Sequence, residues 1–190
     1  MSSKKIALFA SGSGTNVQNI AEYFADNEKV IVDSVWSNRA DAFVLQRAKN
    51  LNVDAFVFSR EEFVNSNSVV EKLIEREVDL IVLAGFLWLV PSNLIQNFKI
   101  LNIHPALLPK YGGKGMYGMK VHEAVVENNE TESGISIHYV NEKYDEGELV
   151  FQATCPVLPT DTADDVANKI HKLEYKHFPE VIEKVLTIAD

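Results

Sequence analysis

Three residues in the second half of the chain combine an amide, an imidazole and a carboxylate: Asn102, His104 and Asp145. An amide N–H and a protonated imidazole can stabilise an oxyanion, and a carboxylate near the imidazole favours its charged form. Acyl transfer to an amine needs these groups. If residues 100–104 are extended, Asn102 and His104 point to the same side, and Pro105 ends the strand. We therefore treat the three as candidate catalytic residues.

Each of the three also has a structural interpretation. A single histidine at a strand end is commonly a hydrogen-bonded structural residue, and Asp145 lies in a turn-like segment, 141–147. His138 is a competing imidazole, because its strand leads toward Asp145. The remaining histidines lie on predicted helices and are expected to be structural or surface residues: His122, His171 and His177. We expect no metal site, because the histidines are scattered and Cys155 is the only thiol.

A loop of small residues joins the first predicted strand to the first helix: Ser11, Gly12, Ser13, Gly14, Thr15 and Asn16. Glycines let backbone N–H groups approach a phosphate, and the helix N-terminus adds partial positive charge. The loop lacks the Gly-Lys-Ser/Thr of a triphosphate site, and Val17 stands where a dinucleotide fingerprint has its third glycine. The pattern therefore favours a monophosphate, with a ligand-free tight turn as the alternative.

Alternating apolar segments predict the elements that position these residues. Strands are expected at Lys5–Ala10, Val30–Val35, Ala55–Phe58, Leu80–Leu83, Ile100–Ile103, Gly134–Val140 and Leu149–Pro156. Helices are expected at Thr15–Asn27, Ala42–Asn50, Val121–Asn128 and Thr162–Leu186, and a short helix is expected to start at Pro91. Another helix should begin at a capping box formed by Ser59 and Glu62 and end near Glu77, with a break near 65–68. This order predicts an α/β fold: a doubly wound, mostly parallel, Rossmann-like sheet with helices on both faces.

A long glycine-rich loop, 104–119, follows the fifth predicted strand. Loops of this length inside a compact domain are usually functional, so we expect a lid. Three lysines and no acid lie within 109–120: Lys110, Lys114 and Lys120. They could attract an anionic substrate as the loop closes, or form a solvated mobile segment.

Composition limits the partners. Eighteen basic and 27 acidic residues give a net charge of −9, so we expect no general nucleic-acid or anionic-membrane binding. The apolar run 80–90 is shorter than the roughly 18 residues that span a membrane. A single cysteine fits a reducing compartment. We expect a cytoplasmic, single-domain monomer or homodimer over residues 1–190.

Four stretches, in this combination and order, resemble the phosphoribosylglycinamide formyltransferase family: 11–16, Leu83-Ala84-Gly85-Phe86, 101–111 beginning Leu-Asn-Ile-His-Pro, and 134–140 running on to Asp145. The resemblance implies a folate-dependent formyltransferase of purine synthesis. Its substrates would be 10-formyltetrahydrofolate and glycinamide ribonucleotide, without a metal. It also divides the domain into a phosphate-binding half, 1–101, and a catalytic and folate-binding half, 102–190.

The resemblance also implies residue roles. Gly12, Ser13, Gly14, Thr15 and Asn16 would hold the ribonucleotide phosphate, and Glu174 would contact the ribonucleotide. Asn102, His104 and Asp145 would be catalytic. The folate site would be lined by Leu87, Trp88, Leu89, Val90, Asn102, Asn141, Glu142, Lys143, Tyr144 and Asp145.

The chain departs from the family pattern in two places. A folate-contacting arginine of the family is replaced here by the stretch 65–67, and Trp88 stands where a familiar member has arginine.

Three rival functions are formylation of initiator methionyl-tRNA, hydrolysis of formyltetrahydrofolate, and nucleotide sensing without catalysis. The first would need a basic surface and an extra nucleic-acid-binding domain. The family that hydrolyses formyltetrahydrofolate carries an additional N-terminal regulatory domain.

Overall fold

The computed structural model describes residues 3–188, which form one α/β unit around a seven-stranded sheet. The strand order is β3-β2-β1-β4-β5-β6-β7. β1 to β5 run parallel to one another. β6 runs antiparallel to both of its neighbours, β5 and β7, so the predicted mostly parallel sheet is confirmed. The strands are β1 (Lys4–Phe9), β2 (Val30–Ser37), β3 (Asp54–Val57), β4 (Leu80–Leu83), β5 (Lys99–His104), β6 (Glu132–Tyr139) and β7 (Leu149–Pro156).

The helices follow the predicted order, with one division. They are α1 (Thr15–Tyr23), α2 (Phe43–Asn50), the π-helix η1 (Glu61–Asn65), α3 (Ser68–Glu75), α4 (Ser92–Asn97), α5 (Met119–Glu127) and α6 (Ala163–Ile188). The capping box is present, with Ser59 N donating to Glu62 Oε2 at 2.7 Å. Extended backbone at Ser66 (φ −134°, ψ 171°) then separates η1 from α3.

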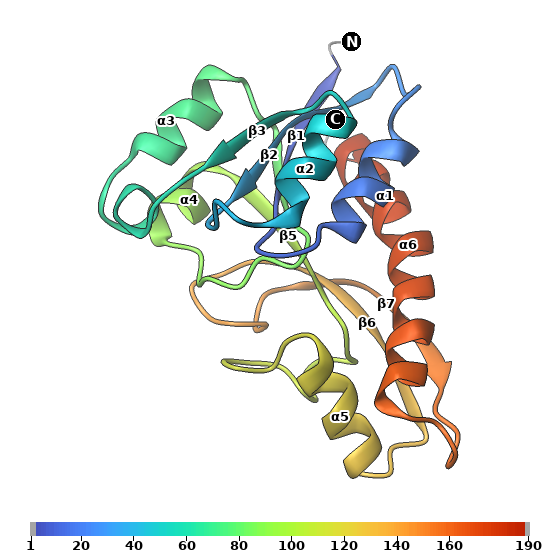
Figure 1. The fold of residues 1–190 in the computed structure, drawn as a ribbon. Coiled ribbons are helices and arrows are strands. Elements are labelled where there is room, and N and C mark those ends of the chain that lie inside the picture. The colour runs from blue at the N-terminus through green and yellow to red at the C-terminus, as the bar shows by residue number, and fades with distance from the viewer. Residues whose placement is uncertain (1–2, 189–190) are drawn as a thin grey trace.

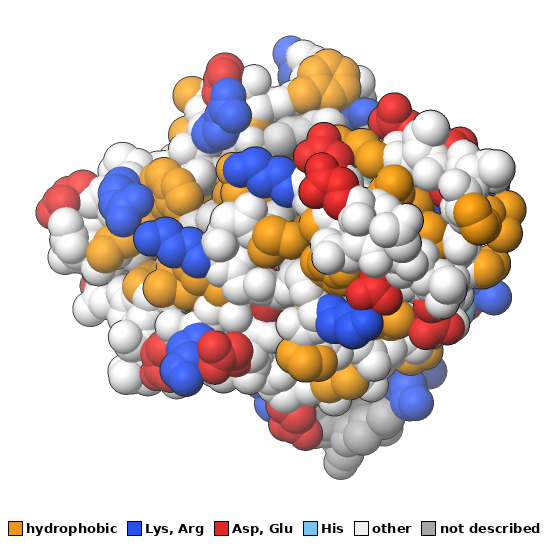
Figure 2. Space-filling model, turned by 90° about the horizontal axis from the view of Figure 1, so that it is seen from below, with side chains coloured by type: hydrophobic (Ala, Val, Ile, Leu, Met, Phe, Trp, Pro, Cys, Tyr) orange, Lys and Arg blue, Asp and Glu red, His pale blue; other side chains and the backbone are white. Residues whose placement is uncertain are grey.

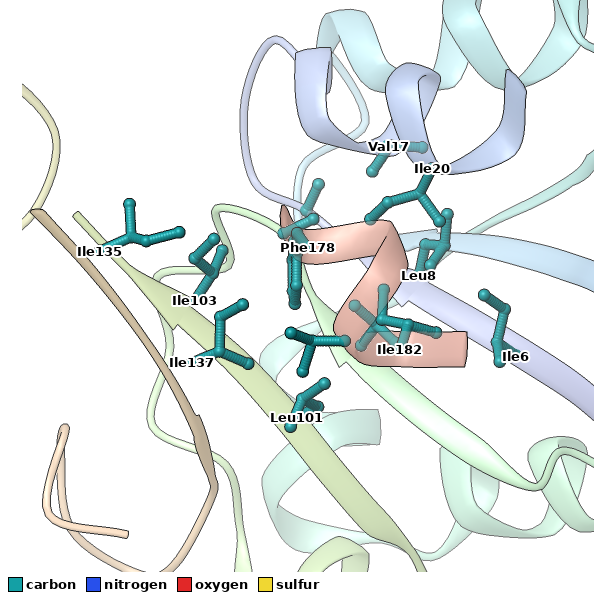
Figure 3. Close-up of a cluster of buried hydrophobic side chains, with 14 of the residues drawn as sticks. Ile6, Leu8, Val17, Ile20, Leu101, Ile103, Ile135, Ile137, Phe178 and Ile182 are labelled. Atoms are coloured by element: carbon teal, nitrogen blue, oxygen red, sulfur yellow. The ribbon is translucent and has the colours of Figure 1, made fainter. Parts of the chain in front are cut away.

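Side-chain alternation divides the core between the two faces of the sheet. Ile6 and Leu8 of β1 pack with α1 and α6 on one face, whereas Ala7 and Phe9 pack with α3 on the other. Figure 3 shows the first cluster, where Phe178 and Ile182 of α6 meet isoleucines and leucines from β1, β5 and β6. Strands buried on both faces explain the unbroken apolar sequence of β4.

The same alternation places polar side chains of β5 and β6 on one face of the sheet. Leu101 and Ile103 of β5 belong to the α1/α6 face, so Asn102 and His104 lie on the opposite face. β6 pairs with β5 so that His138 lies opposite Asn102 and Ser136 opposite His104. Two antiparallel neighbours therefore bring four polar side chains to one patch of the sheet.

The long helix α6 runs along one side of the molecule, past α1 and α5 (Figure 1). Its start is capped, because Asp165 N donates to Thr162 Oγ1 at 3.2 Å and Thr162 N donates to Asp165 Oδ2 at 2.9 Å. No helix within residues 3–188 is long and apolar enough to cross a membrane. Figure 2 shows acidic and basic side chains interspersed with apolar ones on the face seen from below.

Candidate active site

A cavity of about 640 Å³ opens at the carboxyl ends of β1, β4 and β5. Open α/β sheets bind ligands at this edge, where strand order reverses. Most residues predicted from the sequence lie on its wall: the loop 12–16, the segment 87–90, Asn102, His104, 143–145 and Glu174. Asn141 and Glu142 do not line it. Asn141 instead stabilises the turn, because its Oδ1 accepts a hydrogen bond from Lys143 N at 2.9 Å.

The glycine loop is held on several sides. Gly12 O accepts from Val44 N at 3.1 Å, and Ser13 O accepts from Arg47 Nε at 2.8 Å. Gly14 has φ +73°, and a Cβ there would lie 2.3 Å from Val44 Cγ2, so only glycine fits. No side chain caps the N-terminus of α1, which leaves its first N–H groups available to an anion.

Asn102, His104, His138 and Asp145 lie together as one polar group. Asp145 Oδ2 lies 3.5 Å from His104 Nδ1, and Oδ1 lies 3.6 Å from His138 Nε2. The carboxylate also accepts from Gly113 N at 2.9 Å. The structure therefore brings the three predicted residues together and adds His138, the competing imidazole. Both imidazoles are nearly inaccessible to solvent, at 4% for His104 and 2% for His138.

Burial and charge oppose each other at this group. Burial lowers the pKa of His104, while the Asp145 charge and the Tyr111 carbonyl act in the opposite direction. Burial alone would raise the pKa of Asp145, but the neighbouring His138 and His104 imidazoles and the Gly113 N–H outweigh this and lower it. Asp145 is therefore ionised, and it favours a charged His104 as expected, yet without reversing the effect of burial.

The long loop contacts this polar group directly. His104 Nε2 donates to the Tyr111 carbonyl at 2.7 Å. Ser136 Oγ donates to Ala106 O at 2.6 Å and accepts from Leu108 N at 2.9 Å, which fixes the first turn of the loop. Of the three lysines, Lys114 lines the cavity, whereas Lys110 pairs with Glu130 at 2.9 Å. Lys120 lies over the Tyr117 ring, 5.0 Å from its centre, and does not line the cavity.

Leu87 and Leu89 leave apolar surface open in the cavity, with exposed fractions of 44% and 41%. Ser11 Oγ accepts from Leu87 N at 3.0 Å and so ties this segment to the glycine loop. The Arg60 guanidinium lies over the Trp88 ring, with Arg60 Cζ 5.7 Å from the ring centre. Apolar walls beside backbone polar groups suit a flat heteroaromatic ring.

The opposite wall carries histidines that the sequence analysis assigned to structure or surface. His122 of α5 and His171 of α6 both line the cavity. Burial, with the charges of His171 and His104, lowers the pKa of His122 to about 4, so His122 is neutral at physiological pH. Arg39 also lines the cavity and was missed. Helical periodicity gave no signal for the histidines, because α5 and α6 meet only in the tertiary fold.

Glu174 is the most perturbed acid of the site. It is 6% exposed and accepts a hydrogen bond from Asn16 Nδ2 at 3.0 Å. Burial raises the pKa of Glu174 to about 7, and the Asn16 bond opposes this. Between about pH 4.5 and about pH 7 the folded state holds a proton on Glu174 that the unfolded state has released. The contribution of Glu174 to the free energy of unfolding therefore falls as pH rises through this range.

We expect Glu174→Gln to remove that dependence, since glutamine keeps an acceptor for Asn16 and carries no charge. Above about pH 7 the variant should be more stable than the wild type by up to about 3 kcal/mol, and near pH 4.5 the two should be equal. Urea unfolding at pH 5 and pH 8 measures this. The matched control is the exposed Glu123→Gln. If the free energy of unfolding differed between wild type and Glu174→Gln by the same amount at pH 5 and pH 8, the raised pKa assigned to Glu174 would be wrong.

A family described as "Formyl transferase" matches residues 4–182. Phosphoribosylglycinamide formyltransferase of Haemophilus influenzae is 38% identical over 187 residues, covering 95% of this chain and 86% of the relative. The chloroplastic enzyme of that name from Arabidopsis thaliana is 38% identical, covering 94% of this chain, which spans 64% of the plant protein's length. The crystal structure of phosphoribosylglycinamide formyltransferase from Streptococcus pneumoniae superposes with a TM-score of 0.83 at 38% identity, covering 96% and 98% of the two chains.

Proposed function

The chain belongs to the formyl transferase family, and we propose that it transfers the formyl group of 10-formyltetrahydrofolate to the amine of glycinamide ribonucleotide. The products are formylglycinamide ribonucleotide and tetrahydrofolate. One observation supports this proposal most strongly: the glycine loop 12–16, the apolar segment 87–90 and the Asn102/His104/Asp145 group line one cavity. Relatives named for this activity match nearly the whole chain.

In the proposed mechanism the amine attacks the formyl carbon directly, without a covalent enzyme intermediate. The phosphate rests on the N–H groups of 12–16, and Glu174 contacts the ribonucleotide, which places the amine near the folate. Asn102 Nδ2 and His104 donate to the developing oxyanion. The attacking amine loses a proton and the folate nitrogen gains one as the C–N bond breaks, with an ordered water assisting.

His104 has a specific requirement in this mechanism. Its Nε2–H is bonded to the Tyr111 carbonyl, and its Nδ1 faces Asp145. For Nε2–H to reach the formyl oxygen, the Tyr111 carbonyl has to move away when the substrates bind. We therefore propose that the loop 104–119 is a lid and that its movement releases the His104 donor.

The folate ring would lie against 87–90 and the part of the turn that lines the cavity, 143–145, with Lys114 placed to attract its anionic tail. We propose a cytoplasmic location, a monomer or homodimer, and no metal or nucleic-acid partner. No group of three or more metal-ligating side chains is found within residues 3–188.

The test measures the absorbance change on mixing the protein with 10-formyltetrahydrofolate and one of three acceptors. Glycinamide ribonucleotide should give rapid turnover, whereas initiator methionyl-tRNA and water should give little. Turnover with tRNA or with water alone would favour one of the rival formyl-folate reactions. Tight binding of the ribonucleotide without any folate turnover would indicate a nucleotide-sensing protein instead.

A further inference from the structure

We propose that His138 is a positioning residue whose imidazole fixes the orientation of the Asn102 amide, so that an N–H faces the transferred formyl group. The inference rests on the proposed catalytic role of Asn102. The two residues occupy paired positions on antiparallel strands, Asn102 on β5 and His138 on β6. Asn102 Nδ2 lies 3.1 Å from His138 Nε2.

The backbone fixes which nitrogen of His138 carries the proton. His138 Nδ1 lies 2.8 Å from the carbonyl oxygen of Tyr139. A carbonyl oxygen only accepts, so Nδ1 must be the protonated nitrogen. A neutral imidazole has one N–H, which leaves a lone pair on Nε2. The only hydrogen-bonding end of Asn102 that a lone pair can face is the NH₂ group.

The Tyr139 carbonyl is itself held in place. Tyr139 N donates to Glu148 O at 2.8 Å, across the turn that joins β6 to β7. A Cβ at Gly147 would lie 1.7 Å from the Tyr139 oxygen and 3.4 Å from His138 Nδ1. Glycine at 147 therefore permits the close approach that aims this carbonyl at the imidazole.

The consequence reaches the cavity through Asn102. An asparagine amide keeps nearly the same shape after a half-turn, but donor and acceptor exchange places. With Nδ2 directed to His138, the second Nδ2 hydrogen remains available, and the Asn102 side chain lines the cavity. A reversed amide would present its carbonyl oxygen instead and repel an oxyanion.

The Asn102 amide and the Asp145 carboxylate both lie near His138 Nε2. Asp145 Oδ1 lies 3.6 Å from His138 Nε2, and His104 shares the same carboxylate. If His138 gained a second proton, Nε2–H would point at Asp145 Oδ1 and repel the Asn102 NH₂ group. The Asn102 amide would then have no acceptor at Nε2 and would lose its fixed orientation.

The kinetic test uses two substitutions that separate the two ring nitrogens. His138→Asn keeps a polar group near Nδ1 but removes the acceptor at the Nε2 position, whereas His138→Gln can restore an acceptor there. We expect His138→Asn to lower kcat about 10- to 100-fold, less than loss of a whole oxyanion donor, with each KM changed less than about 3-fold. His138→Gln should recover part of the loss.

A double-mutant cycle shows whether His138 acts through Asn102. In an Asn102→Ala background, His138→Asn should lower kcat by less than about 2-fold, because the amide that it positions is gone. An equal loss in both backgrounds would overturn the inference. If Asn102→Ala left kcat unchanged, the proposed catalytic role of Asn102 would be wrong, and this positioning role with it.

Wild-type protein labelled with ¹⁵N-histidine gives a test that needs no variant. Above neutral pH, imidazole ¹⁵N shifts should show His138 protonated at Nδ1 and unprotonated at Nε2. The opposite tautomer would overturn the positioning argument, even if the formyl transfer assay succeeds. Thermal unfolding of each variant separates loss of folding from loss of orientation.

Discussion

Replacing His104 with alanine lowers kcat about 100- to 1000-fold in the proposed mechanism, because one donor to the oxyanion is lost. The KM values should change far less, since His104 acts on charge that develops during transfer. Steady-state kinetics with glycinamide ribonucleotide and 10-formyltetrahydrofolate measure both parameters.

The matched control is His177→Ala on α6, an imidazole that packs on Phe151 with ring centres 5.0 Å apart. This variant should keep kcat within about 2-fold of the wild type, as expected for a site away from the chemistry. A His104→Ala enzyme with near-normal turnover would show that another group stabilises the oxyanion.

Replacing Asp145 with asparagine should lower kcat by about 100-fold or more, because the carboxylate orients His104 and favours its charged form. The Asp145 charge raises the pKa of His104 against the effect of burial, so its removal lowers that pKa further. A protonated His104 is lost as pH rises through its pKa. The alkaline fall of kcat should therefore move to lower pH in Asp145→Asn.

A pH profile of kcat from about pH 5 to pH 9 tests this shift, and far-UV circular dichroism checks that the variant is folded. Glu146→Gln, in the same turn and exposed, is the control and should keep the wild-type profile. A shift of the Asp145→Asn profile to higher pH would contradict the assigned role of the carboxylate.

Much of the fold was predictable because apolar alternation reports burial directly. Their apolar residues predicted both β4 and β6 as strands. β6 is buried on both faces like β4, although Ser136 and His138 on one of its faces are polar. The Ser59/Glu62 capping box likewise indicated where the helical segment after β3 begins. The extended Ser66 was anticipated only as a possible break, since propensity alone does not decide where a helix divides.

The candidate site was predictable where it is local and not where it is assembled. The glycine loop is a short segment between a strand and a helix, and the strand period places Asn102 and His104 on the same face. His122 and His171 occupy the cavity wall because α5 packs on α6, which no local pattern encodes. The contact between Tyr111 and His104 likewise depends on how the long loop folds back, and the sequence analysis did not anticipate it.

The central claim is that the amide, imidazole and carboxylate converge on one carbonyl beside the phosphate loop. The most direct test is a crystal structure with glycinamide ribonucleotide and a non-transferable formyl-folate analogue bound. We predict the formyl-equivalent oxygen within about 3 Å of Asn102 Nδ2 and His104 Nε2, the Tyr111 carbonyl withdrawn, and the phosphate on residues 12–16. A phosphate bound elsewhere, or a carbonyl oxygen out of reach of both side chains, would contradict the account.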